Sequence, residues 1–214
     1  MSFFITGTDT EVGKTFFSVR LVRALRAAGI DAVGFKPVAC GDWEDVDALV
    51  EAADGIEPRS AICPVHLDMP ASPLTAAFAQ ETTIDPATMV SAYRALAARH
   101  EMVIVEGAGG WLVPITPDYF IADLATELAL PVILVVRNRL GALNHTLLTI
   151  ESIHRCGLPC VGIVLNHIDA SDDPAARSNR ATFELLRSVR VLCELESTHA
   201  ELDLGLLALP GVRH

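Results

Sequence analysis

The segment Gly7-Thr8-Asp9-Thr10-Glu11-Val12-Gly13-Lys14-Thr15 follows a short apolar run, Phe3–Thr6, and leads into a segment of helical pattern, Lys14–Ala28. A loop between a strand and a helix that ends in Gly-Lys-Thr is typical of phosphate loops. Backbone amides and the helix N-terminus would hold phosphates, the Lys14 ammonium would reach the β- and γ-phosphate oxygens, and the Thr15 hydroxyl would bind Mg²⁺. The usual spacing places a glycine at position 8, whereas here Gly7 comes one residue earlier. The segment predicts a P-loop that binds a magnesium nucleoside triphosphate.

Strand-like apolar runs and helix-like segments alternate along the chain. The predicted strands are Phe3–Thr6, Ala32–Phe35, Met102–Val105, Pro131–Val136, Cys160–Leu165 and a weaker Val189–Leu195. The predicted helices are Lys14–Ala28, Pro86–His100, Phe120–Ala129, Ala142–Cys156 and Ala175–Ser188, with a short one at Val46–Ala53. Continuously apolar strands are typical of sheets covered on both faces. We therefore expect one α/β domain over residues 1–214, a P-loop nucleotide-binding fold whose mostly parallel central sheet is flanked by helices.

The composition excludes several classes of partner. The 214 residues carry 27 acidic and 16 basic side chains, a net charge of -11, which argues against nucleic acid or an anionic membrane as the partner. No apolar run reaches the length of a membrane span, and no basic leader precedes the first strand, so we expect a cytoplasmic protein. The five cysteines include no Cys-x-x-Cys pair and predict neither a disulfide framework nor a zinc site.

Lysine is rare in this chain. Fourteen of the 16 basic residues are arginine, and the only lysines are Lys14 and Lys36. Codon bias alone could leave two lysines at random, but it does not explain why one of them lies in the phosphate loop. Lysine supplies a compact ammonium that the planar guanidinium does not replace. We therefore predict that Lys36, which follows the second strand, also acts on a transferring phosphoryl or acyl phosphate group.

Polar residues follow several predicted strands, and in a parallel sheet these positions converge on one crevice. Glu106 follows the third strand, where a buried carboxylate needs a cation such as Mg²⁺. The next residues, Gly107, Ala108 and Gly109, allow backbone to approach a ligand closely. Asp47 suits either metal binding or the N-terminus of a short helix. Asn166 suits either a nucleobase contact or a turn.

Together these residues give the chain a resemblance to the dethiobiotin synthetases, ATP-dependent ligases that close the ureido ring in biotin synthesis. The resemblance covers Phe4 to about Ile168. It rests on Thr6–Thr15, Lys36-Pro37-Val38, Asp47-Ala48-Leu49, Val105–Gly110, Pro131–Val136 and Leu140–His145. The early position of Gly7 is also that family's own form.

The resemblance implies that one amine of 7,8-diaminononanoate takes up carbon dioxide, and that the carbamate attacks ATP to give a carbamic–phosphoric anhydride. The second amine then closes the ring and releases phosphate. The implied catalytic residues are Lys14 and Lys36, and the implied Mg²⁺ ligands are Thr15, Asp47 and Glu106. The implied nucleotide contacts are Glu11, Val12, Gly13, Lys14, Thr15, Asp47, Glu106, Gly107, Ala108, Gly109 and, for adenine, Asn166. The implied substrate contacts are Thr10, Lys36, Cys40 and Asn144.

The family works as a homodimer, so the helix that begins near Gly141 would bring Asn144 to the substrate carboxylate held by the other subunit. The chain departs from the family pattern at two places. Cys40 stands where a serine commonly contacts the substrate, and a thiol is a weaker hydrogen-bond partner. Cys193–Ser197 stands where the family usually carries a proline-containing adenine contact.

Two other functions share parts of this pattern. Partitioning-type P-loop ATPases act as switches on DNA or membranes and carry an additional lysine in the phosphate loop, whereas this chain has Asp9 at that position. Amidotransferase-type relatives that act on corrinoid acids need a glutaminase domain, for which 214 residues leave no room. We therefore expect the ligase.

Overall fold

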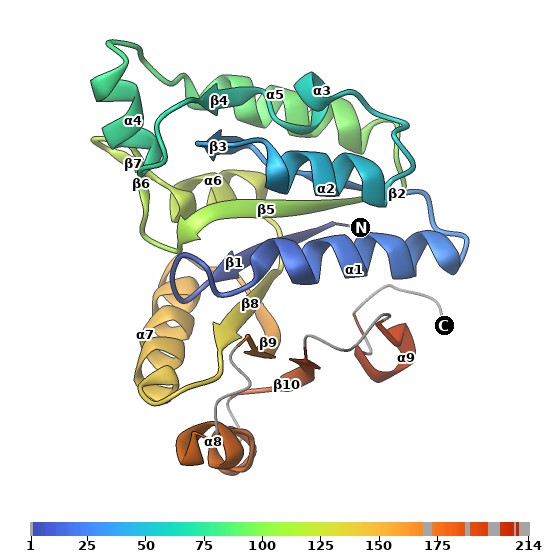
Figure 1. The fold of residues 1–214 in the computed structure, drawn as a ribbon, viewed down its shortest axis with the longest axis vertical. Coiled ribbons are helices and arrows are strands. Elements are labelled where there is room, and N and C mark those ends of the chain that lie inside the picture. The colour runs from blue at the N-terminus through green and yellow to red at the C-terminus, as the bar shows by residue number, and fades with distance from the viewer. Residues whose placement is uncertain (1, 169–172, 187–188, 197–201, 208, 210–214) are drawn as a thin grey trace.

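In the computed structural model, residues 2–168, 173–186, 189–196, 202–207 and 209 are described. Six parallel strands form the central sheet in the order β10-β9-β8-β1-β5-β2 (Figure 1). Their bounds are β1 Phe3–Gly7, β2 Ala32–Phe35, β5 Met102–Gly110, β8 Val132–Arg137, β9 Cys160–His167 and β10 Val191–Glu196. This confirms the predicted α/β fold and all six predicted strands, whose bounds differ from the prediction by a few residues.

Nine helices are found among the described residues. They are α1 Lys14–Ala27, α2 Glu44–Ala52, α3 Arg59–Ile62, α4 Pro73–Ala79, α5 Pro86–Ala97, α6 Ile121–Leu128, α7 Ala142–Arg155, α8 Pro174–Leu185 and α9 Leu204–Leu207. The predicted helices correspond to α1, α2, α5, α6, α7 and α8. The last two residues of the predicted helix Ala175–Ser188 lie outside the described residues.

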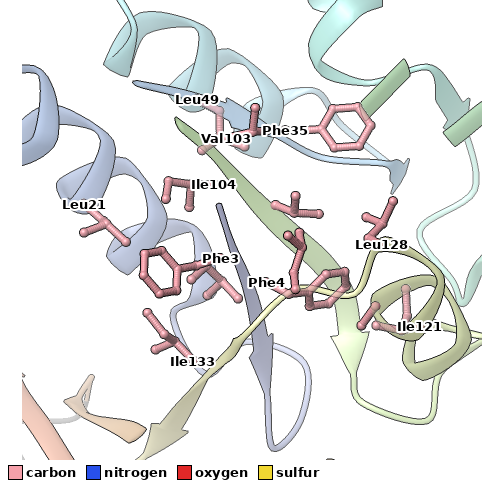
Figure 2. Packing of buried hydrophobic residues seen from close by; sticks show 14 of the residues in the cluster. Phe3, Phe4, Leu21, Phe35, Leu49, Val103, Ile104, Ile121, Leu128 and Ile133 are labelled. Atoms are coloured by element: carbon pink, nitrogen blue, oxygen red, sulfur yellow. The ribbon is translucent and has the colours of Figure 1, made fainter. Parts of the chain in front are cut away.

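Helices cover both faces of the sheet. Successive side chains of β1 point to opposite faces, so each face packs against its own helices. Figure 2 shows Phe3 on the side of Leu21 in α1 and Phe4 on the side of Ile121 in α6. Both phenylalanines are completely buried. On the neighbouring strand β2, a Cβ at Gly34 would lie 2.7 Å from a methyl of Leu49 in α2, so glycine lets this helix pack directly on the sheet. This two-sided packing holds the carboxyl ends of the strands at one edge.

Two short ribbons lie outside the central sheet. β3 Val38–Cys40 pairs in parallel with β4 Val65–Leu67, and β6 Pro114–Thr116 pairs with β7 Tyr119–Phe120 in antiparallel orientation. β3 comes directly after Lys36 and Pro37, so it carries the chain away from the end of β2. Within the described parts of the chain, no helix is both long and apolar enough to cross a bilayer.

Candidate functional site at the carboxyl ends of the strands

The loop between β1 and α1 ends at Gly13, the residue before the first turn of α1. Its φ of 90° lies in the left-handed region that favours glycine, and its carbonyl accepts the first helical hydrogen bond, from Phe17. No side chain caps this helix end. The backbone N–H groups of the first turn are therefore available to an anion, as in phosphate loops.

Asn166 holds this loop from the end of β9. Its Nδ2 donates a hydrogen bond to the Val12 carbonyl at 3.0 Å, and a Cβ at Gly13 would lie 1.9 Å from the same nitrogen. Glycine is therefore required at position 13 for two reasons: a Cβ would collide with Asn166, and the φ angle lies in the left-handed region. Asn166 is buried and lies at the wall of the crevice. Its predicted adenine contact stays a prediction.

Lys36, Asp45 and Glu106 form the most compact charged group of the site. The Lys36 ammonium donates to Glu106 Oε1 at 2.5 Å and to Asp45 Oδ2 at 2.7 Å. Thr15 Oγ1 donates to the same Glu106 oxygen at 2.7 Å. Lys36 is 4% exposed and Glu106 is completely buried. Lys36 directly follows β2, Glu106 lies within β5, and Thr15 and Asp45 lie in the first turns of α1 and α2, so four elements meet at one point. β5 continues to Gly110, so Glu106 does not end the strand as the sequence predicted.

The electrostatics of this group follow from its burial and its opposite charges. Burial alone would lower the pKa of Lys36, but the carboxylates of Glu106 and Asp45 raise it above its ordinary value. Burial would raise the pKa of Asp45, but the Lys36 ammonium that donates to its carboxylate holds the pKa below its usual range. Both partners are therefore charged at neutral pH.

Lys14 is buried close by, and no described carboxylate forms an ion pair with it. Its ammonium donates to the Asp9 carbonyl at 3.0 Å. Burial, and then repulsion by Lys36, lower the pKa of Lys14 to about 8. A site that holds two buried lysines side by side favours an anion, because an anion would stabilise both charges.

The oxygen atoms of this group fit a magnesium ion. Glu106 Oε2 is buried and has no hydrogen-bond partner in the part of the chain that the structure describes, while Thr15 supplies a hydroxyl and Asp45 a second carboxylate. Such oxygen ligands, completed by phosphate oxygens and water, are what Mg²⁺ prefers.

The predicted metal role of Asp47 stays a prediction. In this structure the Asp47 carboxylate is paired with the Arg59 guanidinium, and Asp47 lines neither of the two cavities. Asp45, two residues earlier, lines both. Residues two apart on a helix point about 200° apart, so only one of the two acids at the start of α2 can face the crevice. The sequence shows both acids but not the rotation of the helix.

Two cavities meet at Lys36. The first, about 430 Å³, is lined by Thr10, Glu11, Gly13, Lys14, Thr15, Phe16, Lys36, Asp45, Gly109, Asn166, His167 and Ile168. The second, about 490 Å³, is lined by Thr10, Glu11, Lys36, Ala39, Cys40, Asp42, Asp45, Pro70, Ala71, Ser72, Pro73, Ala108, Gly109 and Val113. Lys36 and Asp45 are among the residues shared by both. The site can therefore hold two ligands whose ends approach the same ammonium.

The other predicted residues divide between these cavities and their surroundings. Cys40 lines the second cavity as a half-buried thiol, and burial raises its pKa to about 11, so it stays protonated at neutral pH. Gly107 does not line either cavity: a Cβ there would lie 3.0 Å from Ile121 and 3.2 Å from Phe4, so glycine permits close packing here, and its nucleotide contact stays a prediction. Asn144 is exposed in the first turn of α7, away from both cavities of its own chain.

Sequence reasoning missed several lining residues. Asp45 is one of three acidic residues at the start of α2, and the sequence did not distinguish it from the other two. No sequence motif includes His167, yet this residue lines the first cavity and its Nε2 is hydrogen-bonded to Glu194 Oε2 at 2.7 Å. The segment 70–73 lies at the end of the least regular region of the sequence, Gly41–Pro70, and just beyond it. The Cys193–Ser197 segment reaches β10, but Ser197 lies outside the described residues.

Comparisons with solved structures support the fold alone. A ParA family ATPase from Chlorobium tepidum has a TM-score of 0.54 at 12% identity, covering 92% of this chain and 85% of that one. The cell division protein FtsY from Thermotoga maritima has a TM-score of 0.53 at 17% identity, covering 97% of this chain and 66% of that one.

Sequence comparisons are more specific. Residues 1–201 match the model of an AAA domain family. The ATP-dependent dethiobiotin synthetase of Akkermansia muciniphila is 45% identical over 96% of this chain and 97% of its own length. Those of Anaeromyxobacter dehalogenans and Nitrosopumilus maritimus are 52% and 37% identical, covering 83% and 89% of this chain and 82% and 86% of their own lengths. The chain therefore belongs to the ATP-dependent dethiobiotin synthetases, within this AAA domain family.

Proposed function

We propose that the chain forms dethiobiotin from 7,8-diaminononanoate, carbon dioxide and ATP, as the names of its relatives suggest. The observation that carries the proposal is the position of Lys36 at the junction of two cavities. Phosphates would lie in the first cavity against the α1 N-terminus, and the diamine in the second. The reacting groups would then meet beside one buried ammonium.

The chemistry would follow the sequence implied by the family. One amine takes up carbon dioxide as a carbamate, and a carbamate oxygen attacks the γ-phosphorus of ATP, releasing ADP. The second amine attacks the carbonyl carbon of the anhydride, the C–O bond breaks, and phosphate leaves as the ring closes. Lys14 and Lys36 would stabilise the negative charge on the carbamate and the transferring phosphoryl group.

Magnesium would be held by Thr15, Glu106 and Asp45, the last in place of the predicted Asp47. When bound, the ion would neutralise charge on the phosphate oxygens. The chain's own contribution is to bury Glu106 completely, which strengthens its electrostatic contacts, while Thr15 and Asp45 remain partly exposed beside it. Thr10 and Glu11 line both cavities and would separate the phosphates from the diamine.

A homodimer would complete the substrate site. No described side chain caps the N-terminus of α7, so its N–H groups suit a carboxylate. Leu140 is 81% exposed and Leu148 is 63% exposed, and apolar side chains at such exposure favour a protein contact over solvent. Asn144, exposed beside them, would reach the substrate held by the partner.

A phosphate-release assay with one component omitted at a time tests the proposal. Release should require diamine, bicarbonate and Mg-ATP together, because the carbamate is the phosphoryl acceptor. Substantial release without diamine, or stimulation by DNA or lipid, would instead support a partitioning-type ATPase.

A further inference from the structure

The Lys36 ammonium lies on the same carboxylates that would hold the metal. It contacts Glu106 at 2.5 Å and Asp45 at 2.7 Å, and it is almost completely buried. The pair carries two negative charges, and the ammonium neutralises one of them. The carboxylates of this site are therefore already bound to a cation that belongs to the chain itself.

A divalent cation entering this pair would have to displace the ammonium from both acceptors. The displaced charge would remain buried near the Lys14 ammonium, which is also buried and lines the same cavity. An unpaired buried charge is strongly unfavourable. Metal binding without another anion is therefore opposed by the lysine.

A nucleoside triphosphate would change this balance. Lys36 lines the cavity that extends to the phosphate loop, so phosphate oxygens there would offer the ammonium new acceptors. The same phosphates would supply oxygen ligands to the metal. Among the described residues, no cluster of three or more His, Cys, Asp or Glu side chains suits a metal, so the nucleotide is also needed to complete the ligand set.

We propose that the Lys36 ammonium occupies the Asp45–Glu106 pair in the absence of nucleotide and thereby makes metal binding depend on nucleotide. Without nucleotide the ammonium fills the pair; with nucleotide it transfers to phosphate oxygens and the metal replaces it. The residue thus couples the binding of two ligands, in addition to its role in stabilising charge. The inference rests on the proposed function only in that the first cavity binds Mg-ATP.

Direct metal binding without diamine tests this coupling. Free Mn²⁺ is measured by electron paramagnetic resonance during titration of wild type, Lys36→Met and Lys14→Met, with and without a non-hydrolysable ATP analogue. Lys36→Met should bind Mn²⁺ without nucleotide about tenfold or more tightly than wild type, the usual scale of such coupling. Lys14→Met is the matched control: it removes a neighbouring ammonium that contacts no carboxylate, and its gain should stay below about threefold.

The double variant Lys36→Met/Asp45→Asn shows whether the gained affinity lies at the pair, and it should return Mn²⁺ binding to about the wild-type level. An unchanged affinity in Lys36→Met, or an equal gain in Lys14→Met, would overturn the proposal. Circular dichroism checks that each variant is folded.

If Lys36→Met does not fold, calorimetry on the wild type still tests whether metal binding depends on nucleotide. Mg²⁺ should bind with the nucleotide analogue and should show no binding without it below millimolar concentration. Equal Mg²⁺ affinity in both conditions refutes the coupling. Product formation is measured separately on wild type, so an active ligase with nucleotide-independent metal binding would refute this inference and leave the proposed function intact.

Discussion

Replacing Gly13 with alanine should be far more harmful than replacing Gly141, although the two glycines have the same local structure. Each precedes a helix of 14 residues, and their φ angles are 90° and 91°. Among the described residues, a Cβ at Gly141 would meet nothing within 4 Å, whereas a Cβ at Gly13 would lie 1.9 Å from Asn166 Nδ2. Gly141→Ala is therefore a matched control that contains the backbone strain and lacks the collision.

The structure allows the two costs to be separated. Alanine in the left-handed region costs about 1–2 kcal/mol, and Gly141→Ala should show this cost alone. Gly13→Ala adds the displacement of Asn166 and the loss of its hydrogen bond to the buried Val12 carbonyl. Leaving such groups without a partner costs about 1–3 kcal/mol. We expect a total near 3–4 kcal/mol, or roughly a 10 °C fall in Tm, against about 4 °C for Gly141→Ala.

Thermal and urea unfolding of a double-mutant cycle checks this calculation. In an Asn166→Ala background the collision is removed, so Gly13→Ala should cost the same as Gly141→Ala, which gives a coupling of about 2 kcal/mol. If Gly13→Ala is as mild as Gly141→Ala in the wild-type background, or if Asn166→Ala does not relieve it, the contact does not constrain the phosphate loop.

Three further predictions concern the remaining parts of the site and fold. Lys36→Arg should lose roughly 100-fold in turnover, because a planar guanidinium cannot take the place of a buried ammonium; near-normal turnover would remove Lys36 from the chemistry. Asn144→Ala should weaken diamine binding in calorimetry and leave nucleotide binding nearly intact; equal losses for both would contradict its place on the substrate side. Burial would raise the pKa of Glu57, but hydrogen bonds from His100 and Arg99 hold it below 4.5, so its stabilisation is full above that pH and is lost as the pH falls through the lowered value. The Tm of Glu57→Gln should accordingly fall less than that of wild type when the pH is lowered from about 5 to about 3. Parallel curves of Tm against pH for the two proteins would contradict this.

The sequence predicted the parts of the fold that depend on local pattern. Continuous apolar runs identified the central strands, since a strand buried on both faces has no polar alternation to obscure it. Gly13, Lys14 and Thr15 are adjacent, so their chemistry needs no knowledge of the rest of the fold. The short ribbons were not predicted, because three-residue strands such as β3 and β4 carry too little periodicity.

Contacts between distant segments were harder to predict. Lys36 and Glu106 are separated by 70 positions, and the sequence placed both at strand ends without showing that they bind each other. The choice between Asp45 and Asp47 depends on how α2 is rotated against β2, which is decided by the packing of Leu49 on Gly34. The contact between Asn166 and the phosphate loop likewise follows from strand order, which no local pattern encodes.

Isotope transfer from labelled bicarbonate tests the ligase reaction most directly. The enzyme is supplied with diamine, Mg-ATP and freshly mixed bicarbonate carrying ¹³C and ¹⁸O, and both products are examined by mass spectrometry. We expect one ¹³C in dethiobiotin and one ¹⁸O in the released phosphate, because the carbamate oxygen that attacks phosphorus leaves with it. Phosphate that carries no ¹⁸O while dethiobiotin forms would exclude the carbamic–phosphoric anhydride, and release of phosphate without any labelled dethiobiotin would contradict the ligase itself.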